Sequence, residues 1–198
     1  MTEKPIAIVT GVGPGTGAAI VKRFSAGGFR IIALARSTEL INRLAQELPD
    51  VHAVTCDVSD ESQVRAVVTD VKRRFGAAEV LIHNAVGGGW GSFREIDPKM
   101  LKGNFEVNVM GLLYLAREVA SDMIDRGKGA ILVTGNTSSI RGKANFAGFA
   151  PTKAAQRSRR NWPCLGSKTC FRSPGSRPCL DRSCQELLRA PGTTSPSR

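Results

Sequence analysis

One stretch decides the fold of this 198-residue chain: Pro5-Ile6-Ala7-Ile8-Val9-Thr10-Gly11-Val12-Gly13-Pro14-Gly15-Thr16-Gly17. A short apolar run leads into a glycine-dense turn, and a helix-like pattern follows over residues 18–24. A strand-to-helix turn that lacks bulky side chains lets backbone N–H groups approach a pyrophosphate at the helix N-terminus. The stretch therefore predicts a strand, a phosphate-binding turn and a helix.

Strand and helix patterns alternate from this turn as far as Gln156. Apolar runs typical of strands cover residues 6–9, 30–35, 51–55, 80–83 and 130–134. Between them, apolar residues recur at helical spacing, as in the stripe Val64, Val67, Val68, Val71 and Phe75. This alternation predicts an α/β fold: a Rossmann-like, doubly wound parallel sheet of strand order 3-2-1-4-5, in three αβα layers.

The composition changes where this pattern ends. Residues 157–198 hold nine Lys or Arg against two Asp or Glu, so seven of the eleven net positive charges lie there. The same segment holds four of the five cysteines and five of the ten prolines, without strand or helix periodicity. We therefore expect a nucleotide-binding domain over residues 1–156 and a disordered basic tail over residues 157–198.

Charge, hydropathy and cysteine usage bear on the class of partner, the cellular location and metal binding. The net charge of +11 indicates an anionic partner, but most of it lies in the tail, so nucleic-acid binding through the tail is the least favoured function. No run of about 18 apolar residues is present, which argues against a membrane span. A single cysteine in residues 1–156 is typical of a reducing, cytoplasmic setting. The tail cysteines form no Cys-x-x-Cys pair and have no His nearby, so we expect no metal site.

Further motifs follow the glycine turn in a fixed order. They are Asp57-Val58, His83-Asn84-Ala85-Val86, Asn108-Val109-Met110-Gly111, the pair Ser138-Ser139, and Phe149-Ala150-Pro151-Thr152-Lys153. Together with the Thr-Gly-x-x-x-Gly-x-Gly spacing at residues 10–17, they make residues 5–156 resemble the short-chain dehydrogenase/reductase family. The resemblance implies an oxidoreductase that moves a hydride between an alcohol and a ketone or aldehyde.

The resemblance also implies a bound nicotinamide dinucleotide. Arg36 stands where an acidic residue would select NAD(H), and its guanidinium suits a 2′-phosphate, so NADP(H) is favoured over NAD(H). Other interpretations remain open: a solvated arginine at a helix start for Arg36, a helix cap for Asp57, and a buried strand-end residue for His83. The cofactor-binding residues implied by the resemblance are Gly11, Gly13, Gly15, Thr16, Gly17, Arg36, Asp57, Val58, Asn84, Ala85 and Lys153.

The catalytic residues implied by the resemblance are Asn108, Ser139, Phe149 and Lys153. Asn108 would hold a water in a proton relay, and Ser139 would orient the substrate. Ser138 is the alternative, because the interval from Ser139 to the next motif is shorter than in the family. Lys153 would hold the nicotinamide ribose.

Phe149 is the decisive departure, because the family has a tyrosine four residues before its lysine. A phenyl ring cannot donate a proton, and the loss of a positioned general acid costs about 10²–10⁴-fold in rate. Activity is therefore expected to be impaired in this chain.

The tail departs from the family as well. The family continues past its lysine with a long helix and two further strands, whereas Pro163 interrupts any helix here. We hypothesise a frameshift near residues 156–159, because reading the codons of Asn161-Trp162-Pro163 two bases later yields a Leu-Ala pair suited to a helix. The sheet would then lack its last strands, and its fifth strand would be an exposed edge.

Two functions follow from these observations. The first is an NADP(H)-dependent oxidoreductase that acts on a small carbonyl compound or alcohol and is impaired in this chain. The second is a non-catalytic dinucleotide-binding protein or an inactive frameshifted product. A homo-oligomer stays open, and the substrate cannot be named because the segment that would line its pocket departs from the family pattern.

Overall fold

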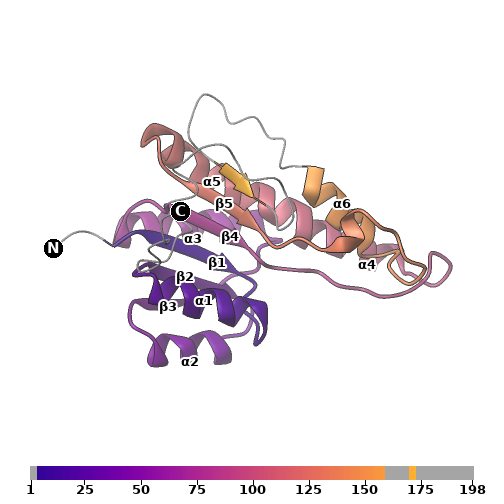
Figure 1. The fold of residues 1–198 in the computed structure, drawn as a ribbon, viewed down its shortest axis with the longest axis horizontal. Helices are drawn as coiled ribbons and strands as arrows, with labels where there is room; N and C mark the ends of the chain where they lie inside the picture. The colour runs from indigo at the N-terminus through magenta and orange to yellow at the C-terminus, as the bar shows by residue number, and fades with distance from the viewer. Residues whose placement is uncertain (1–3, 159–169, 173–198) are drawn as a thin grey trace, which may run out of the picture.

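The computed structural model describes residues 4–158 and 170–172, which are built around one parallel sheet (Figure 1). Within these residues, six strands pair in the order β3-β2-β1-β4-β5-β6. They are β1 (Ile6–Thr10), β2 (Arg30–Ala35), β3 (Val51–Thr55), β4 (Val80–His83), β5 (Ala130–Val133) and β6 (Cys170–Arg172). The first five lie where the sequence predicts them, and their order confirms the doubly wound topology.

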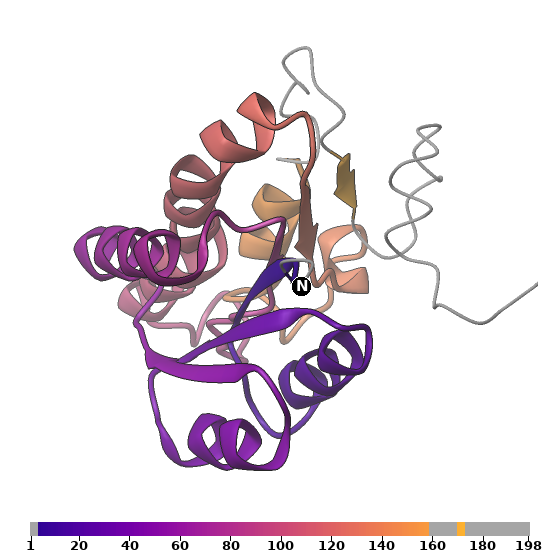
Figure 2. The same ribbon diagram turned by 90° about the vertical axis from the view of Figure 1, so that its left-hand side faces the viewer.

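Helices cover both faces of the sheet (Figure 2). They are α1 (Thr16–Ala26), α2 (Glu39–Glu47), α3 (Glu61–Phe75), α4 (Pro98–Phe105), α5 (Gly111–Asp125) and α6 (Ala150–Ser158). A π-helical segment, η1 (Glu106–Met110), joins α4 to α5, and a 3-10 turn, η2 (Thr137–Ser139), follows β5. Because α1 and α2 pack on one face and α3 and α5 on the other, the predicted three layers are confirmed.

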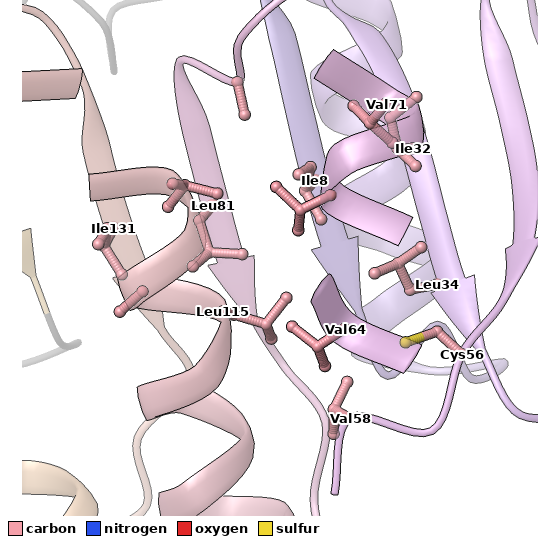
Figure 3. Close-up of a cluster of buried hydrophobic side chains, with 14 of the residues drawn as sticks. Ile8, Ile32, Leu34, Cys56, Val58, Val64, Val71, Leu81, Leu115 and Ile131 are labelled. Carbon is pink, nitrogen blue, oxygen red and sulfur yellow. The ribbon is translucent and has the colours of Figure 1, made fainter. Parts of the chain in front are cut away.

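The pleat of the strands explains why both faces are apolar. Successive side chains of a strand point to opposite faces, so Ile8 of β1 packs with the α3 and α5 cluster while Val9 packs with the α1 and α2 cluster. Figure 3 shows Ile8 of β1 and Leu34 of β2 on the same side of the sheet as Val64 from α3 and Leu115 from α5. A parallel strand that is covered on both sides reads as a continuous apolar run, which is why these strands are visible in the sequence.

The expectation that β5 forms an exposed edge is wrong. β6 lies parallel to β5, with Cα partners Ala130–Cys170, Ile131–Phe171 and Leu132–Arg172. An edge strand presents unpaired N–H and C=O groups with which another extended segment can pair. A pairing segment of three residues is too short to show an alternating pattern in the sequence.

The boundary predicted at residue 156 lies inside α6, which runs to Ser158. Of the rest of the predicted tail, only β6 is described; residues 159–169 and 173–198, with the cysteines at 164, 179 and 184, lie outside the described residues. The frameshift hypothesised near residues 156–159 concerns the gene and is not tested by the structure. The division of the chain into a domain and a disordered tail stays a prediction.

Helix α4 was not part of the sequence prediction, although its start is encoded locally. The Asp97 side chain accepts a hydrogen bond from the Lys99 N–H at 2.8 Å, and Pro98 occupies the first turn. Because α4, η1 and α5 follow one another directly, the helical chain runs without a break through a π-helical turn. That turn holds Asn108, whose side chain is fully buried.

The glycine turn meets the end of β4 without space for a side chain. Gly11 has a φ of +65°, and a Cβ on it would overlap the backbone of Ala85 and lie 2.7 Å from the carbonyl carbon of Asn84. Gly13, two residues later, would place a Cβ with nothing within 4 Å. Gly11 is therefore required by packing, whereas Gly13 is free of that constraint.

We expect the substitution Gly11→Ala to lower the free energy of unfolding by about 2–4 kcal/mol, because it combines left-handed backbone strain with overpacking against β4. The matched control Gly13→Ala should change it by less than about 1 kcal/mol. Urea denaturation followed by circular dichroism measures both. Equal midpoints for the two variants would contradict the close approach described for Gly11.

Candidate functional site

A cleft of about 780 Å³ lies at the carboxyl ends of the central strands, and residues from β1 to α6 line it. This edge is where a doubly wound sheet binds its ligand, because the chain turns to opposite faces on either side of β1 and β4. The lining residues are Gly11, Val12, Gly13, Gly15, Thr16, Gly17, Leu34, Ala35, Arg36, Ser37, Cys56, Asp57, Val58, Asn84, Ala85, Val86, Val107, Thr134, Gly135, Asn136, Phe149 and Lys153. All of the predicted cofactor-binding residues are among them.

The glycine turn presents the N-terminus of α1 to this cleft. Gly15 is the N-cap of α1, no side chain caps it, and no acidic residue lies in the first turn. The first N–H groups of a helix have no partner inside it and attract anions. A Cβ on Gly17 would lie 2.5 Å from the Gly11 carbonyl oxygen and 2.7 Å from Val12 Cα, so the turn stays tight and its backbone stays accessible. This cradle fits a pyrophosphate.

Thr10 links the glycine turn to the end of β4. Its Oγ1 accepts hydrogen bonds from the N–H groups of Asn84 and Ala85, both at 3.2 Å, and lies 3.3 Å from His83 Nδ1. The Asn84 amide donates in turn to the Gly11 carbonyl oxygen at 2.7 Å. Asn84 and Ala85 are thereby held against the cleft. His83 is fully buried, and burial lowers its pKa to about 3, so the imidazole is uncharged at neutral pH.

Arg36 and Ser37 lie at the far end of the cleft, after β2, and both are exposed. Asp57 lines the same cleft and follows β3, the neighbour of β2 in the sheet. Its carboxylate accepts hydrogen bonds from the Ser59 hydroxyl at 2.6 Å and the Ser59 N–H at 3.0 Å. These bonds, with help from the charge of Arg36, hold the pKa of Asp57 below its usual value. Asp60, and not Asp57, is the N-cap of α3, so Asp57 shapes the turn before that helix and also lines the cleft.

Phe149 and Lys153 form the opposite end of the cleft. Phe149 directly precedes α6, and the Lys153 ammonium lies 5.7 Å from the centre of its ring. Lys153 is buried, and its Nζ donates to the Thr134 carbonyl oxygen at 3.2 Å and to Gln156 Oε1 at 2.8 Å. Burial lowers the pKa of Lys153 to about 8. An ammonium has three N–H donors, so one remains for a ligand in the cleft.

Asn108 is not brought to the cleft lining. Its side-chain oxygen accepts from the Gly87 N–H at 2.9 Å, and its amide nitrogen donates to the Gly87 carbonyl oxygen at 3.1 Å and to Thr152 Oγ1 at 2.8 Å. The side chain therefore holds the loop after β4 against α6. Its backbone carbonyl oxygen accepts a further bond from Gln156 Nε2 at 2.9 Å.

Neither candidate serine lines the cleft, and Asn136 does. The Ser139 hydroxyl donates to the Asn136 carbonyl oxygen at 2.7 Å, whereas Ser138 Oγ is buried without a hydrogen-bond partner among the described residues. The Asn136 side chain accepts from the Ser138 N–H at 2.9 Å and caps η2. Asn136 precedes Ser139 by three residues, and the short interval from Ser139 to Phe149 was the signal in the sequence that could have identified it.

Ser37 and Gln156 were also missed by the sequence interpretation. Ser37 directly follows Arg36, where a hydroxyl beside a guanidinium is a reasonable anion ligand. Gln156 lies one helical turn after Lys153, at a spacing that brings side chains together. Sequence spacing could have indicated both positions, but not the partners of Gln156 in the fold.

An aromatic cluster of Trp90, Phe146 and Phe149 lies beside the Lys153 end of the cleft. The ring centre of Trp90 is 4.6 Å from that of Phe146 and 5.4 Å from that of Phe149. Backbone bonds from Gly91 N–H to the Asn145 carbonyl and from Ala147 N–H to the Gly91 carbonyl hold the two loops together. Trp90 is 63% exposed, so the cluster offers an open apolar surface next to Phe149.

Two further observations concern metals and membranes. In the part of the chain that the structure describes, no group of three or more His, Cys, Asp or Glu residues could hold a metal ion. None of the helices within residues 4–158 has the length and apolar character needed to cross a membrane.

Comparison with known proteins places this geometry in a family. The family model described as short chain dehydrogenase matches residues 5–158. Farnesol dehydrogenase of Aedes aegypti is 34% identical over 132 residues, which cover 61% of this chain and 52% of that protein. A short-chain dehydrogenase from Streptomyces avermitilis has a TM-score of 0.77 at 32% identity, over 81% of this chain and 60% of its own.

A second solved structure is gluconate 5-dehydrogenase from Burkholderia cenocepacia J2315 in complex with NADP and tartrate. It has a TM-score of 0.71 at 28% identity, over 79% of this chain and 63% of its own. The chain thus spans less than two thirds of the length of each of these three relatives. The match over residues 5–158, together with the sheet order and the glycine turn, shows that this chain belongs to the short-chain dehydrogenase family.

Proposed function

We propose that this chain binds NADP(H) in the cleft and supports hydride transfer between an alcohol and a ketone or aldehyde, at a rate limited by Phe149. The observation that carries the proposal is one cleft lined in turn by the glycine turn, Arg36 and Lys153. When bound, a nicotinamide dinucleotide supplies or accepts the hydride. The NADP complex of the gluconate 5-dehydrogenase relative supports this choice of cofactor.

The roles of the binding residues follow from their charge and position. The N-terminus of α1 would hold the pyrophosphate. Arg36 would contact the 2′-phosphate that distinguishes NADP(H), with Ser37 beside it. The remaining N–H donor of Lys153 would bind a ribose hydroxyl, while Asn84 and Ala85 hold the nearby turn in place.

Delivery of a proton to the product oxygen is the step that this site supports least. Phe149 has no hydroxyl, and Tyr114, the only tyrosine of the chain, packs against the core on α5. Asn136 lines the cleft, and its carboxamide can orient a carbonyl oxygen by hydrogen bonding. An amide does not act as a general acid at neutral pH, so protonation of the product oxygen would depend on water.

A second candidate function is dinucleotide binding without catalysis. The observation that favours it is the same Phe149, together with the position of both candidate serines outside the cleft lining. A homo-oligomeric state and a cytoplasmic location stay predictions from the sequence. Nucleic-acid binding through the tail concerns residues 157–198, of which the structure describes only 157–158 and 170–172.

We expect Arg36→Ala to weaken NADPH binding by about tenfold to a hundredfold, because it removes charge-assisted hydrogen bonds to a phosphate. NADH binding should change little, since NADH lacks that phosphate. Isothermal titration calorimetry measures both affinities. Arg43→Ala is the control, because Arg43 is an exposed arginine of α2 outside the cleft lining. An equal loss for NADPH and NADH would contradict the role of Arg36.

We expect Phe149→Tyr to raise NADPH-dependent reduction of a ketone panel by about 10²-fold or more, because it supplies a phenol next to Lys153. Loss of NADPH absorbance under single-turnover conditions measures the rate. Phe146→Tyr is the control, since it adds a hydroxyl to the same aromatic cluster at a residue outside the cleft lining. NADPH binding without ketone reduction, in both the wild type and Phe149→Tyr, would favour the non-catalytic function.

A further inference from the structure

A buried amide connects α6 to η1 behind the cleft. Lys153 Nζ donates to Gln156 Oε1 at 2.8 Å, and Gln156 Nε2 donates to the Asn108 carbonyl oxygen at 2.9 Å. All three residues are buried. Asn108, to which the sequence interpretation assigned a water, accepts the Gln156 amide at its backbone carbonyl oxygen.

The chemistry of the two partners determines the orientation of this amide. An ammonium has only donors, so the amide oxygen must face Lys153. A carbonyl oxygen has only lone pairs, so the amide N–H must face Asn108. The reversed amide would pair two donors at one end and two acceptors at the other. The Gln156 amide therefore has only one possible orientation, with its oxygen toward Lys153 and its N–H toward Asn108.

The ammonium of Lys153 lacks an acidic partner among the described residues. Its hydrogen-bond partners are two neutral oxygens, from Thr134 and Gln156. From β4 the titratable neighbour is His83, which is uncharged, and from η1 the facing group is the neutral Asn108. A buried charge without a counterion depends strongly on each oxygen that solvates it, so the loss of one should lower the pKa of Lys153 further.

We propose that Gln156 is a positioning residue that fixes the ammonium of Lys153 at the cleft and keeps it charged through an oriented amide link to the Asn108 carbonyl. The Gln156 amide stabilises the charged ammonium of Lys153, and the amide itself does not ionise. It leaves one N–H of Lys153 for the ligand, and in this respect the inference rests on the proposed dinucleotide function. The amide does not ionise near neutral pH, so it does not carry a proton away from Lys153.

Titration of the Lys153 amine without any dinucleotide tests the proposal directly. Competitive amine labelling at a series of pH values, read by peptide mass spectrometry, gives the pKa of Lys153 in the full chain. We expect Gln156→Leu to lower that pKa by about one to two units, because it removes a hydrogen bond to a charged group. Gln156→Glu should raise it, because a carboxylate favours the ammonium.

Gln46→Leu is the matched control, because Gln46 is an exposed glutamine of α2 and should leave the Lys153 titration unchanged. Thermal denaturation checks that each variant folds. If Gln156→Leu fails to fold, the rise in the Lys153 pKa expected for Gln156→Glu serves as the test. An unchanged Lys153 pKa in the folded Gln156 variants would overturn the proposal.

NADPH binding as a function of pH separates this inference from the proposed function. The charged ammonium favours an anionic ligand, so wild-type affinity should fall as the pH rises through about 8. The fall should begin at lower pH in Gln156→Leu and at higher pH in Gln156→Glu. Absence of NADPH binding in the wild type at every pH would overturn the proposed function, while the amine titration still decides the role of Gln156.

Discussion

The contact between the glycine turn and the end of β4 is the constraint on which the site depends. Gly11 lies against the backbone of Ala85, where no Cβ fits. The Thr10 hydroxyl accepts two N–H groups from the end of β4, and Asn84 donates back to Gly11. Because the strand order reverses between the parallel neighbours β1 and β4, the contact that closes the turn also sets the position of the cleft.

The cleft has positive groups of different character at its two ends. Arg36 is exposed, and an exposed guanidinium keeps its charge at little cost. Lys153 is buried among neutral oxygens, and its charge depends on Thr134 and Gln156. The α1 N-terminus lies between them and adds a partial positive charge. This arrangement suits an elongated anion, while Phe149 gives the Lys153 end of the cleft an apolar face. In the proposed function, ligand binding and proton transfer would therefore depend on different residues.

The strands and most of the helices could be predicted because their signals are local. Buried parallel strands are continuous apolar runs, and the glycine turn has a distinctive spacing. The exposed-edge prediction for β5 failed because β6 is a three-residue strand that pairs across a long stretch of sequence. Helix α4 was missed although Asp97 and Pro98 encode its start, because its apolar pattern is short.

The sequence by itself determined the order of the elements, the glycine turn, and the loss of a phenol at residue 149. Only the tertiary structure decided which polar groups meet: Asn136 in the cleft in place of Ser139, and Gln156 between Lys153 and Asn108. The physical reason is distance along the chain. Periodicity and turn chemistry depend on neighbours within a few residues, whereas the Gln156 link joins residues 48 apart and forms only when α6 packs against η1.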